Sequence, residues 1–183
     1  MALLKSINVQ LGTKAIDFCL KGIDGAMHSL ADYDAKDVLV IVIMCNHCPY
    51  VHAVDDRLVL LQEKFAERNV QLVGINPNDG IKYPDDNFEN MVKRAEEKGY
   101  NFPYLRDEDQ SIAKKYQAQC TPDIYVYNKE RELCYHGQID DNWQHPEKVT
   151  SHDLSDAIEA LLGGGKPSPN QYPSMGCSIK WKE

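Results

Sequence analysis

The stretch Cys45-Asn46-His47-Cys48-Pro49 decides the fold of this chain. It follows the apolar run 38–44 and precedes a segment with helical periodicity, so the two cysteines stand where a buried strand passes into a helix. A helix N-terminus presents unpaired N–H groups and the positive end of the helix dipole, and both stabilise a thiolate. Because the thiolate is the nucleophile in disulfide exchange, the stretch indicates a dithiol that opens and closes.

The composition is that of a globular protein, with 183 residues, 43% hydrophobic and 26% charged side chains. This length fits one domain with a sizeable core. The net charge of −8 argues against nucleic acid and against an anionic membrane surface as partners. The longest apolar run, 38–45, is far too short to cross a bilayer.

The first ten residues contain no long apolar core, so we expect no secretory signal and a cytoplasmic location. The chain has six cysteines. In a cytosolic protein, Cys-x-x-Cys beside alternating strand and helix patterns indicates redox chemistry rather than a framework of structural disulfides. We expect neither a cofactor nor a bound metal.

Strand and helix patterns alternate along the chain. We predict a hairpin over 15–20 and 27–30, a central strand over 38–44, a helix over 49–69, a strand over 70–75, a helix from Asp85-Asp86 to Gly99, an extended segment at 103–105, a short helix over 109–118, a second hairpin over 124–127 and 133–136, and a last helix over 149–162. Strands linked through helices are parallel, whereas the second hairpin adds antiparallel strands. The predicted fold is an α/β domain over 1–162, with a mixed central sheet, helices on both faces and an N-terminal β-hairpin. A Gly- and Pro-rich C-terminal tail follows over 163–183.

Thr121-Pro122 stands just before the second hairpin. A proline at such a position can be cis, which shapes a tight turn and withholds an N–H. Together with Cys45-x-x-Cys48, this pair makes the chain resemble the redoxin branch of the thioredoxin-like superfamily, of the AhpC/TSA and TlpA/ResA type. The resemblance covers roughly 10–162 and includes the segments 12–18, 24–25, 29–33, 74–76, 121–123 and 137–140.

The resemblance implies a role for each residue of the site and a thioredoxin-like fold. Cys45 would be the exposed attacking thiol, and Cys48 the more buried resolving thiol. Cys45 would form a mixed disulfide with the substrate, and Cys48 would release it. Pro122 would be cis and oppose the dithiol, in a loop with Thr121 that helps hold the substrate chain.

The residues around the cysteines, His47 and Pro49, set the redox potential. A protonated His47 beside the Cys45 thiolate would stabilise the reduced form and make the disulfide more oxidising than that of a typical thioredoxin. A higher potential in a His47→Pro variant would count against this hypothesis.

Two features of related proteins are missing from this sequence. Peroxiredoxins carry Pro-x-x-x-Thr-x-x-Cys, but alignment of Cys48 with the peroxidatic cysteine puts Cys45 at the Thr position and Ile41 at the Pro position. The strand over 38–44 also offers no buried acid below the dithiol. His52 lies four residues after Cys48, where it could share a helix face with that thiol and serve as its base.

The other cysteines divide into two groups. Cys120 lies two residues before Pro122 and could approach the dithiol, whereas Cys19 and Cys134 lie in strand patterns and are expected to pack as small hydrophobic residues. In the tail, Cys177, Ile179 and Trp181 alternate, so one face could dock as an added strand. We hypothesise that this tail packs near the site and that Cys177 enters disulfide exchange.

The predicted function is therefore a thiol:disulfide oxidoreductase. Its partners would be a protein disulfide or a small thiol substrate and an external thiol reductant, and the chain would be a monomer or weak dimer. Two alternatives stay open. One is a thiol peroxidase. The other is a metal-binding or metallochaperone module, for which His47 and His52 could add to the two cysteines, although no second Cys-x-x-Cys completes a zinc site.

Overall fold

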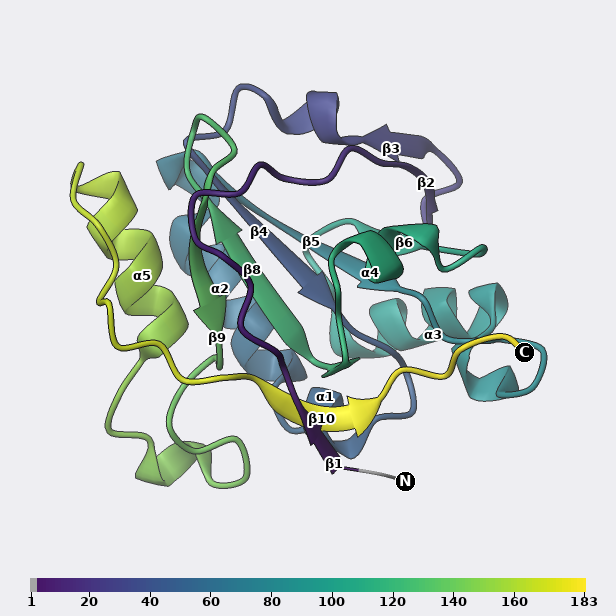
Figure 1. The fold of residues 1–183 in the computed structure, drawn as a ribbon. Helices are drawn as coiled ribbons and strands as arrows, with labels where there is room; N and C mark the ends of the chain where they lie inside the picture. The colour runs from purple at the N-terminus through teal and green to yellow at the C-terminus, as the bar shows by residue number, and fades with distance from the viewer. Residues whose placement is uncertain (1–2) are drawn as a thin grey trace.

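A seven-stranded mixed sheet forms the centre of the molecule (Figure 1). The computed structural model describes residues 3–183. The strand order is β3-β2-β6-β5-β4-β8-β9. The strands are β2 (Cys19–Gly22), β3 (Met27–Ser29), β4 (Val38–Ile43), β5 (Val70–Asn76), β6 (Tyr104–Arg106), β8 (Asp123–Tyr127) and β9 (Leu133–Gly137). Strands β4, β5 and β6 run parallel, and β8 pairs antiparallel with β4. Both predicted hairpins are confirmed, as β2–β3 and β8–β9.

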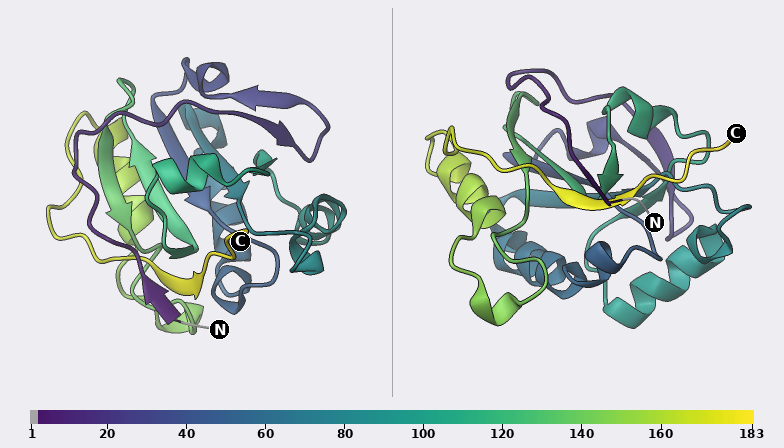
Figure 2. Two further views of the ribbon diagram at one scale, coloured as in Figure 1. Left: turned by 45° about the vertical axis from the view of Figure 1, so that its right-hand side comes forward. Right: turned by 60° about the horizontal axis from the view of Figure 1, so that its bottom comes forward.

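Helices cover both faces of this sheet, as predicted (Figure 2). On one face lie α2 (Asp55–Phe65), α3 (Phe88–Lys98) and α5 (Asp153–Leu162), and on the other lies α4 (Ser111–Lys115). The structure also contains short 3-10 helices, namely η1 (Leu30–Tyr33), η2 (Ala66–Arg68), η3 (Pro84–Asp86) and η4 (Pro146–Lys148). All six residues of β4 are buried because the strand is covered from both sides, which explains its unbroken apolar sequence.

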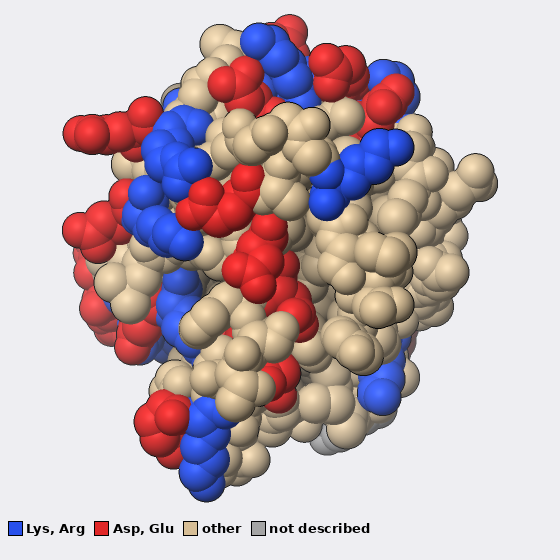
Figure 3. Space-filling view, turned by 90° about the vertical axis from the view of Figure 1, so that its left-hand side faces the viewer, with Lys and Arg blue, Asp and Glu red and all other residues tan. Residues whose placement is uncertain are grey.

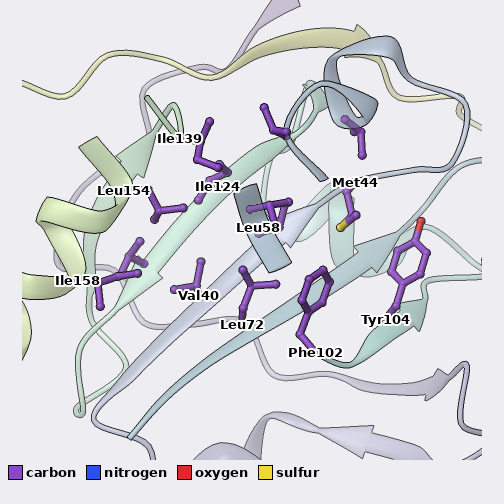
Figure 4. Packing of buried hydrophobic residues seen from close by; sticks show 14 of the residues in the cluster. Val40, Met44, Leu58, Leu72, Phe102, Tyr104, Ile124, Ile139, Leu154 and Ile158 are labelled. Carbon is purple, nitrogen blue, oxygen red and sulfur yellow. The ribbon is translucent and has the colours of Figure 1, made fainter. Parts of the chain in front are cut away.

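The main core lies between the sheet and the larger helical layer (Figure 4). Val40 and Leu72 from the sheet, Leu58 from α2 and Ile158 from α5 are all fully buried there. Met44, at the end of β4, belongs to the same cluster and leads directly into the Cys-x-x-Cys segment. The rigid core therefore fixes the start of that segment.

Two predicted helices differ from the structure at their ends. The predicted helix over 49–69 is interrupted at 53–54, which leaves a single turn, α1 (Pro49–His52), ahead of α2. The predicted helix from Asp85 begins later, at Phe88, because the Asn87 side chain accepts a hydrogen bond from the Asn90 amide and caps it. Gly99, with a φ of 63°, ends this helix as expected.

The C-terminal segment adds a strand of its own. Strand β10 (Met175–Ser178) lies between β1 (Leu3–Lys5) and β7 (Cys120–Thr121) in a separate three-stranded sheet. Both neighbours are antiparallel to it. In Figure 1 this strand, in yellow, crosses the molecule beside α1. The tail thus docks as an added strand, as hypothesised, but the strand ends at Ser178 and contains only Cys177 of the three alternating residues.

The surface carries both signs of charge. On the face shown in Figure 3, acidic side chains run in a band down the middle, with Lys and Arg side chains grouped beside it. This mixture accords with a chain whose net charge of −8 comes from 28 acidic and 20 basic residues. Within 3–183, no helix combines the length and the apolar composition that a membrane span requires.

Candidate active site

The two cysteines lie where the sequence places them, between the end of β4 and the start of α1. Pro49 is the first residue of α1 and Cys48 caps it with extended backbone, so the proline's missing N–H costs no helical hydrogen bond. Both thiols are buried, with Cys45 1% and Cys48 0% exposed. The expectation of an exposed Cys45 is therefore wrong. The cause is that Thr121, at 3.3 Å, and the His47–Asp86 pair, within 4.8 Å, surround the Cys45 sulfur, while β10 packs against α1 and β7 on the Cys48 side.

The Thr121-Pro122 loop faces the dithiol, and its peptide bond is cis as expected. The Cys45 Sγ lies 3.3 Å from the Thr121 Oγ1, and the protonated Cys48 thiol donates to the Thr121 carbonyl oxygen at 3.0 Å. Thr121 thus contacts both sulfurs, one through its side chain and one through its backbone. This loop forms one wall of the site.

The two thiols both lie against Thr121 and titrate as a pair. The pKa of Cys48 is lowered because the Cys45 thiol donates to it, with further help from Thr121 and Cys177. The pKa of Cys45 is raised by burial, by its bond to Cys48 and by the charge of Asp86. Once the pair has lost one proton, these directions place the negative charge on Cys48, whereas the sequence analysis placed it on Cys45.

His47 lies beside Cys45, and a buried acid holds it there. The ring Nδ1 of His47 contacts the Asp86 Oδ2, and the ring stacks on Tyr83 with 5.8 Å between centroids. This hydrogen bond to Asp86 raises the pKa of His47, which favours the imidazolium. Ligand atoms of Cys45, His47 and Asp86 all lie within 4.8 Å of one another. The raised pKa thus supports the positive charge expected on His47 next to the dithiol. The imidazolium also forms an ion pair with the Asp86 carboxylate.

Asp86 is the site residue that the sequence analysis missed, because Asp85-Asp86 was assigned to the start of a helix. It is fully buried in η3. Burial alone would raise the pKa of Asp86, but hydrogen bonds from His47 and Asn78 outweigh burial and lower it. The Asn46 amide also donates to its Oδ1 at 2.6 Å. An acid does accompany the dithiol, and it comes from η3 rather than from the central strand.

Asn46 fixes the loop between the cysteines through each of its polar groups. Besides the amide bond to Asp86, its Nδ2 donates to the Asp85 carbonyl at 2.8 Å, and its Oδ1 accepts from the Tyr104 hydroxyl at 2.9 Å. Its carbonyl oxygen contacts the His52 Nε2. His52 is exposed and bonds this carbonyl instead of a thiol, so the suggested role of His52 as a base is not supported.

The four remaining cysteines differ in their burial and in the groups that they contact. Cys177 is buried beside the dithiol, where it pairs with Thr121 and helps to lower the pKa of Cys48. Cys120 is also buried, but its Sγ faces the carbonyl oxygens of Pro122 and Ser174, at 3.7 and 3.9 Å. Cys134 is partly buried and Cys19 is exposed, which contradicts a packing role for Cys19.

A surface cleft of about 400 Å³ opens at His47. Its walls come from the inter-cysteine loop, from η3 and from α3. The lining residues are Asn46, His47, His52, Asp85, Asn90, Lys93, Arg94 and Glu97. Cys45 lies on the His47 side of the site, next to this cleft. Cys48 lies on the other side, between Cys45 and Cys177.

A buried dithiol ahead of a helix, opposed by a cis-proline loop on a mixed sheet, defines a thioredoxin-like protein with thiol-based redox chemistry. The model of the AhpC/TSA family matches residues 11–136, and the chain belongs to this family. Among curated proteins, no match to this chain is found.

Two solved structures resemble the whole chain closely. An uncharacterized conserved protein from Geobacillus kaustophilus is 43% identical, with a TM-score of 0.94 over 100% of this chain and 97% of that chain. A hypothetical protein from Sinorhizobium meliloti is 38% identical, with a TM-score of 0.93 over 97% and 98%. Both similarities include the tail.

More distant structures share the fold. A peroxidoxin, BcpB, from Mycobacterium tuberculosis is 17% identical, with a TM-score of 0.60 over 85% of this chain and 96% of that chain. A putative thiol:disulfide interchange protein, DsbE, from Chlorobium tepidum is 16% identical, with a TM-score of 0.65 over 86% and 98%.

Proposed function

We propose that this protein is a thiol:disulfide oxidoreductase in which Cys45 attacks the substrate disulfide and Cys48 resolves the mixed disulfide. The observation that carries the proposal is the pair of buried thiols at the start of α1, which both contact Thr121 in the loop with the cis proline. When two thiols share one proton, the other proton is already lost and one sulfur is a thiolate, which is the form that disulfide exchange requires.

The position of the two thiols supports Cys45 as the attacking one. Cys45 lies beside His47, and His47 lines the open cleft, whereas Cys48 is enclosed by Thr121 and Cys177. Once the pair has lost its first proton, the Cys48 thiolate is the acceptor for the Cys45 proton when a substrate arrives. The His47 imidazolium then stabilises the charge that develops on Cys45.

The reaction proceeds in two exchanges. The Cys45 sulfur attacks one sulfur of the substrate disulfide, the substrate S–S bond breaks, and the first substrate thiolate leaves. Cys48, after losing the proton it received, attacks the Cys45 sulfur and releases the second substrate thiolate. The substrate is reduced by two electrons, and the dithiol becomes a Cys45–Cys48 disulfide that an external thiol reduces again.

Trapping with glutathione disulfide tests this order of attack. A Cys48→Ser variant lacks the resolving thiol, so we expect a stable mixed disulfide on Cys45, found by mass spectrometry of the intact protein and its peptides. The matched Cys45→Ser variant should form none through this route. Adducts on Cys48 but not on Cys45 would reverse the roles, and a wild-type protein that never forms the Cys45–Cys48 disulfide would contradict the proposal.

A metal-binding module is the second candidate, favoured by the cluster of Cys45, His47 and Asp86. Thiolate, imidazole and carboxylate groups are the ligands that zinc takes in proteins. The redox function ranks first because His47 and Asp86 already satisfy each other as an ion pair. Elemental analysis of the purified protein, with Asp86→Asn as a comparison, decides between them: stoichiometric zinc that falls in the variant favours the metal site.

A further inference from the structure

Strand β10 brings Cys177 to the dithiol from the far end of the chain. In the antiparallel register, Cys177 pairs with Thr121 and Ser178 pairs with Cys120. The strand therefore lies directly on the residue that precedes the cis proline. Figure 1 shows β10, in yellow, beside β1 and α1.

The fit between β10 and the loop depends on Gly176. A Cβ atom added at this position would lie 1.9 Å from the Thr121 carbonyl oxygen and 2.6 Å from the Thr121 carbonyl carbon. Only a residue without a side chain lets the two backbones approach this closely. The next residue, Cys177, pairs in register with Thr121, and the Thr121 carbonyl oxygen lies 3.0 Å from the Cys48 sulfur, so the strand brings Cys177 beside Cys48.

Hydrogen bonds on either side hold β10 in this position. Before the strand, the Ser174 hydroxyl donates to the Gly137 carbonyl at 2.6 Å, and the Ser6 amide donates to the Ser174 carbonyl at 2.9 Å. After the strand, the Lys180 amide donates to the Asn78 Oδ1 at 2.8 Å. Cys177 is 3% exposed, so it meets Cys48 inside the protein and away from competing solvent thiols.

We propose that Cys177 is a third redox thiol of this site, which exchanges with the Cys45–Cys48 disulfide and takes Cys48 as its partner. The proposal rests on the oxidoreductase function, because it needs the dithiol to be oxidised first. The Cys177 thiol loses its proton and attacks the Cys48 sulfur. The Cys45–Cys48 bond breaks, the Cys48–Cys177 bond forms, and Cys45 leaves as a thiolate that takes up a proton. No outside oxidant is consumed, since one disulfide replaces another.

The exchange gives the tail a chemical role. It moves the disulfide from the side of the site that opens at His47 to the side covered by β10, and it returns Cys45 as a free thiol. The covalent bond also ties β10 to α1. Cys120 is the matched cysteine that takes no part, because its sulfur faces two carbonyl oxygens and contacts neither thiol of the pair in the hydrogen bonds above.

Disulfide mapping after treatment with diamide tests the proposal. In Cys45→Ser, we expect an intramolecular Cys48–Cys177 disulfide, seen as a mass loss of about 2 Da and as a cross-linked peptide in a non-reducing digest. Cys120 should stay free in the same sample. In Cys177→Ser, the Cys45–Cys48 disulfide should form as in the wild type. Circular dichroism confirms that each variant is folded.

A second measurement uses the wild-type protein. After oxidation by one equivalent of diamide, iodoacetamide should label Cys45 while Cys48 and Cys177 stay protected in a fraction of the molecules, and this fraction should vanish in Cys177→Ser. If Cys48 and Cys177 stay unpaired in Cys45→Ser, and Cys45 of the oxidised wild type is never labelled, the proposal is wrong. The oxidoreductase function would survive that result, whereas loss of the Cys45–Cys48 disulfide in both the wild type and Cys177→Ser would overturn the function itself.

Discussion

Asp86 binds the imidazole of His47 from a fully buried position, and the pair lies within 4.8 Å of the Cys45 sulfur. The carboxylate raises the pKa of the imidazole, and the imidazole in turn lowers the pKa of the carboxyl against the effect of burial. The two charges therefore support each other next to the dithiol.

The pair should give stability a characteristic dependence on pH. Because the folded pKa of His47 is raised, its contribution is full below the usual histidine pKa of about 6.5 and is lost as pH rises through the raised value. Because the folded pKa of Asp86 is lowered, its contribution is full above about 3.9 and is lost as pH falls through the lowered value. The stabilisation by the pair should therefore be greatest between about pH 4 and 6.5.

Urea unfolding of reduced wild type and His47→Gln measures this dependence. The difference in the free energy of unfolding between the two proteins should be larger at about pH 5.5 than at about pH 8.5. Groups other than the pair titrate in both proteins and cancel in the difference. A difference that is the same at both pH values would show that the imidazolium contributes nothing to the fold.

The charge of His47 should also set the redox potential. The imidazolium stabilises the thiolate form of the pair, so His47→Gln should lower the potential by about 30 mV, which corresponds to about 1.4 kcal/mol. Equilibrium titration against glutathione measures the potential. His52→Gln is the control, since His52 is exposed and bonds only the Asn46 carbonyl in the site. A rise in the His47→Gln potential, or an equal shift in the control, would contradict this role.

Gly176→Ala tests the close approach of β10 to the Thr121 carbonyl. The new methyl group overlaps that oxygen, so the strand must shift. We expect a loss of about 1–3 kcal/mol in the free energy of unfolding, together with faster alkylation of Cys48 by iodoacetamide. Gly163→Ala is the matched control. Its φ is −79° and its added Cβ meets the Glu159 carbonyl oxygen at an ordinary 3.4 Å, so its effect should stay within about 0.5 kcal/mol. Equal alkylation in the two variants would mean that β10 does not cover the dithiol.

Helix α2 offers a test of the core beneath the site (Figure 4). Leu58 is fully buried against the sheet, so Leu58→Ala should cost about 2–5 kcal/mol of the free energy of unfolding. Leu60, in the same helix, is 61% exposed, and Leu60→Ala should change stability by no more than about 0.5 kcal/mol. Similar losses in the two variants would argue against this placement of α2.

Much of the fold could be predicted because its signals are local. The apolar run of β4, the spacing of Leu58, Leu61 and Phe65 in α2, and the turn residues of the β8–β9 hairpin each identify their element without knowledge of the rest of the chain. The Cys-x-x-Cys spacing and Thr121-Pro122 identify two walls of the site for the same reason. The first residues of helices were harder to predict. Asp86 and Asn87 are both residue types that favour the N-cap position, and only the structure shows that Asn87 caps α3.

The parts of the site that the sequence analysis missed depend on contacts between distant segments. Asp86 reaches His47 across 39 positions of the chain, and a buried Asp looks like any capping Asp until that contact is seen. The cover on the Cys48 side of the dithiol comes from β10, about 130 residues further on, in a tail whose prolines gave no strong strand signal. The position of the charge on Cys48 depends in turn on hydrogen bonds from Cys45, Thr121 and Cys177.

The most direct test of the proposed function is the catalysed reduction of a protein disulfide, with insulin as substrate and dithiothreitol as the electron donor. The wild type should accelerate the reaction, and Cys45→Ser and Cys48→Ser should each lose at least about a hundredfold of that activity. Cys120→Ser, which alters a buried cysteine outside the exchange pathway, should keep it. A wild type that is no faster than dithiothreitol alone, or a Cys45→Ser variant as active as the wild type, would contradict the assignment of this dithiol as the catalytic centre.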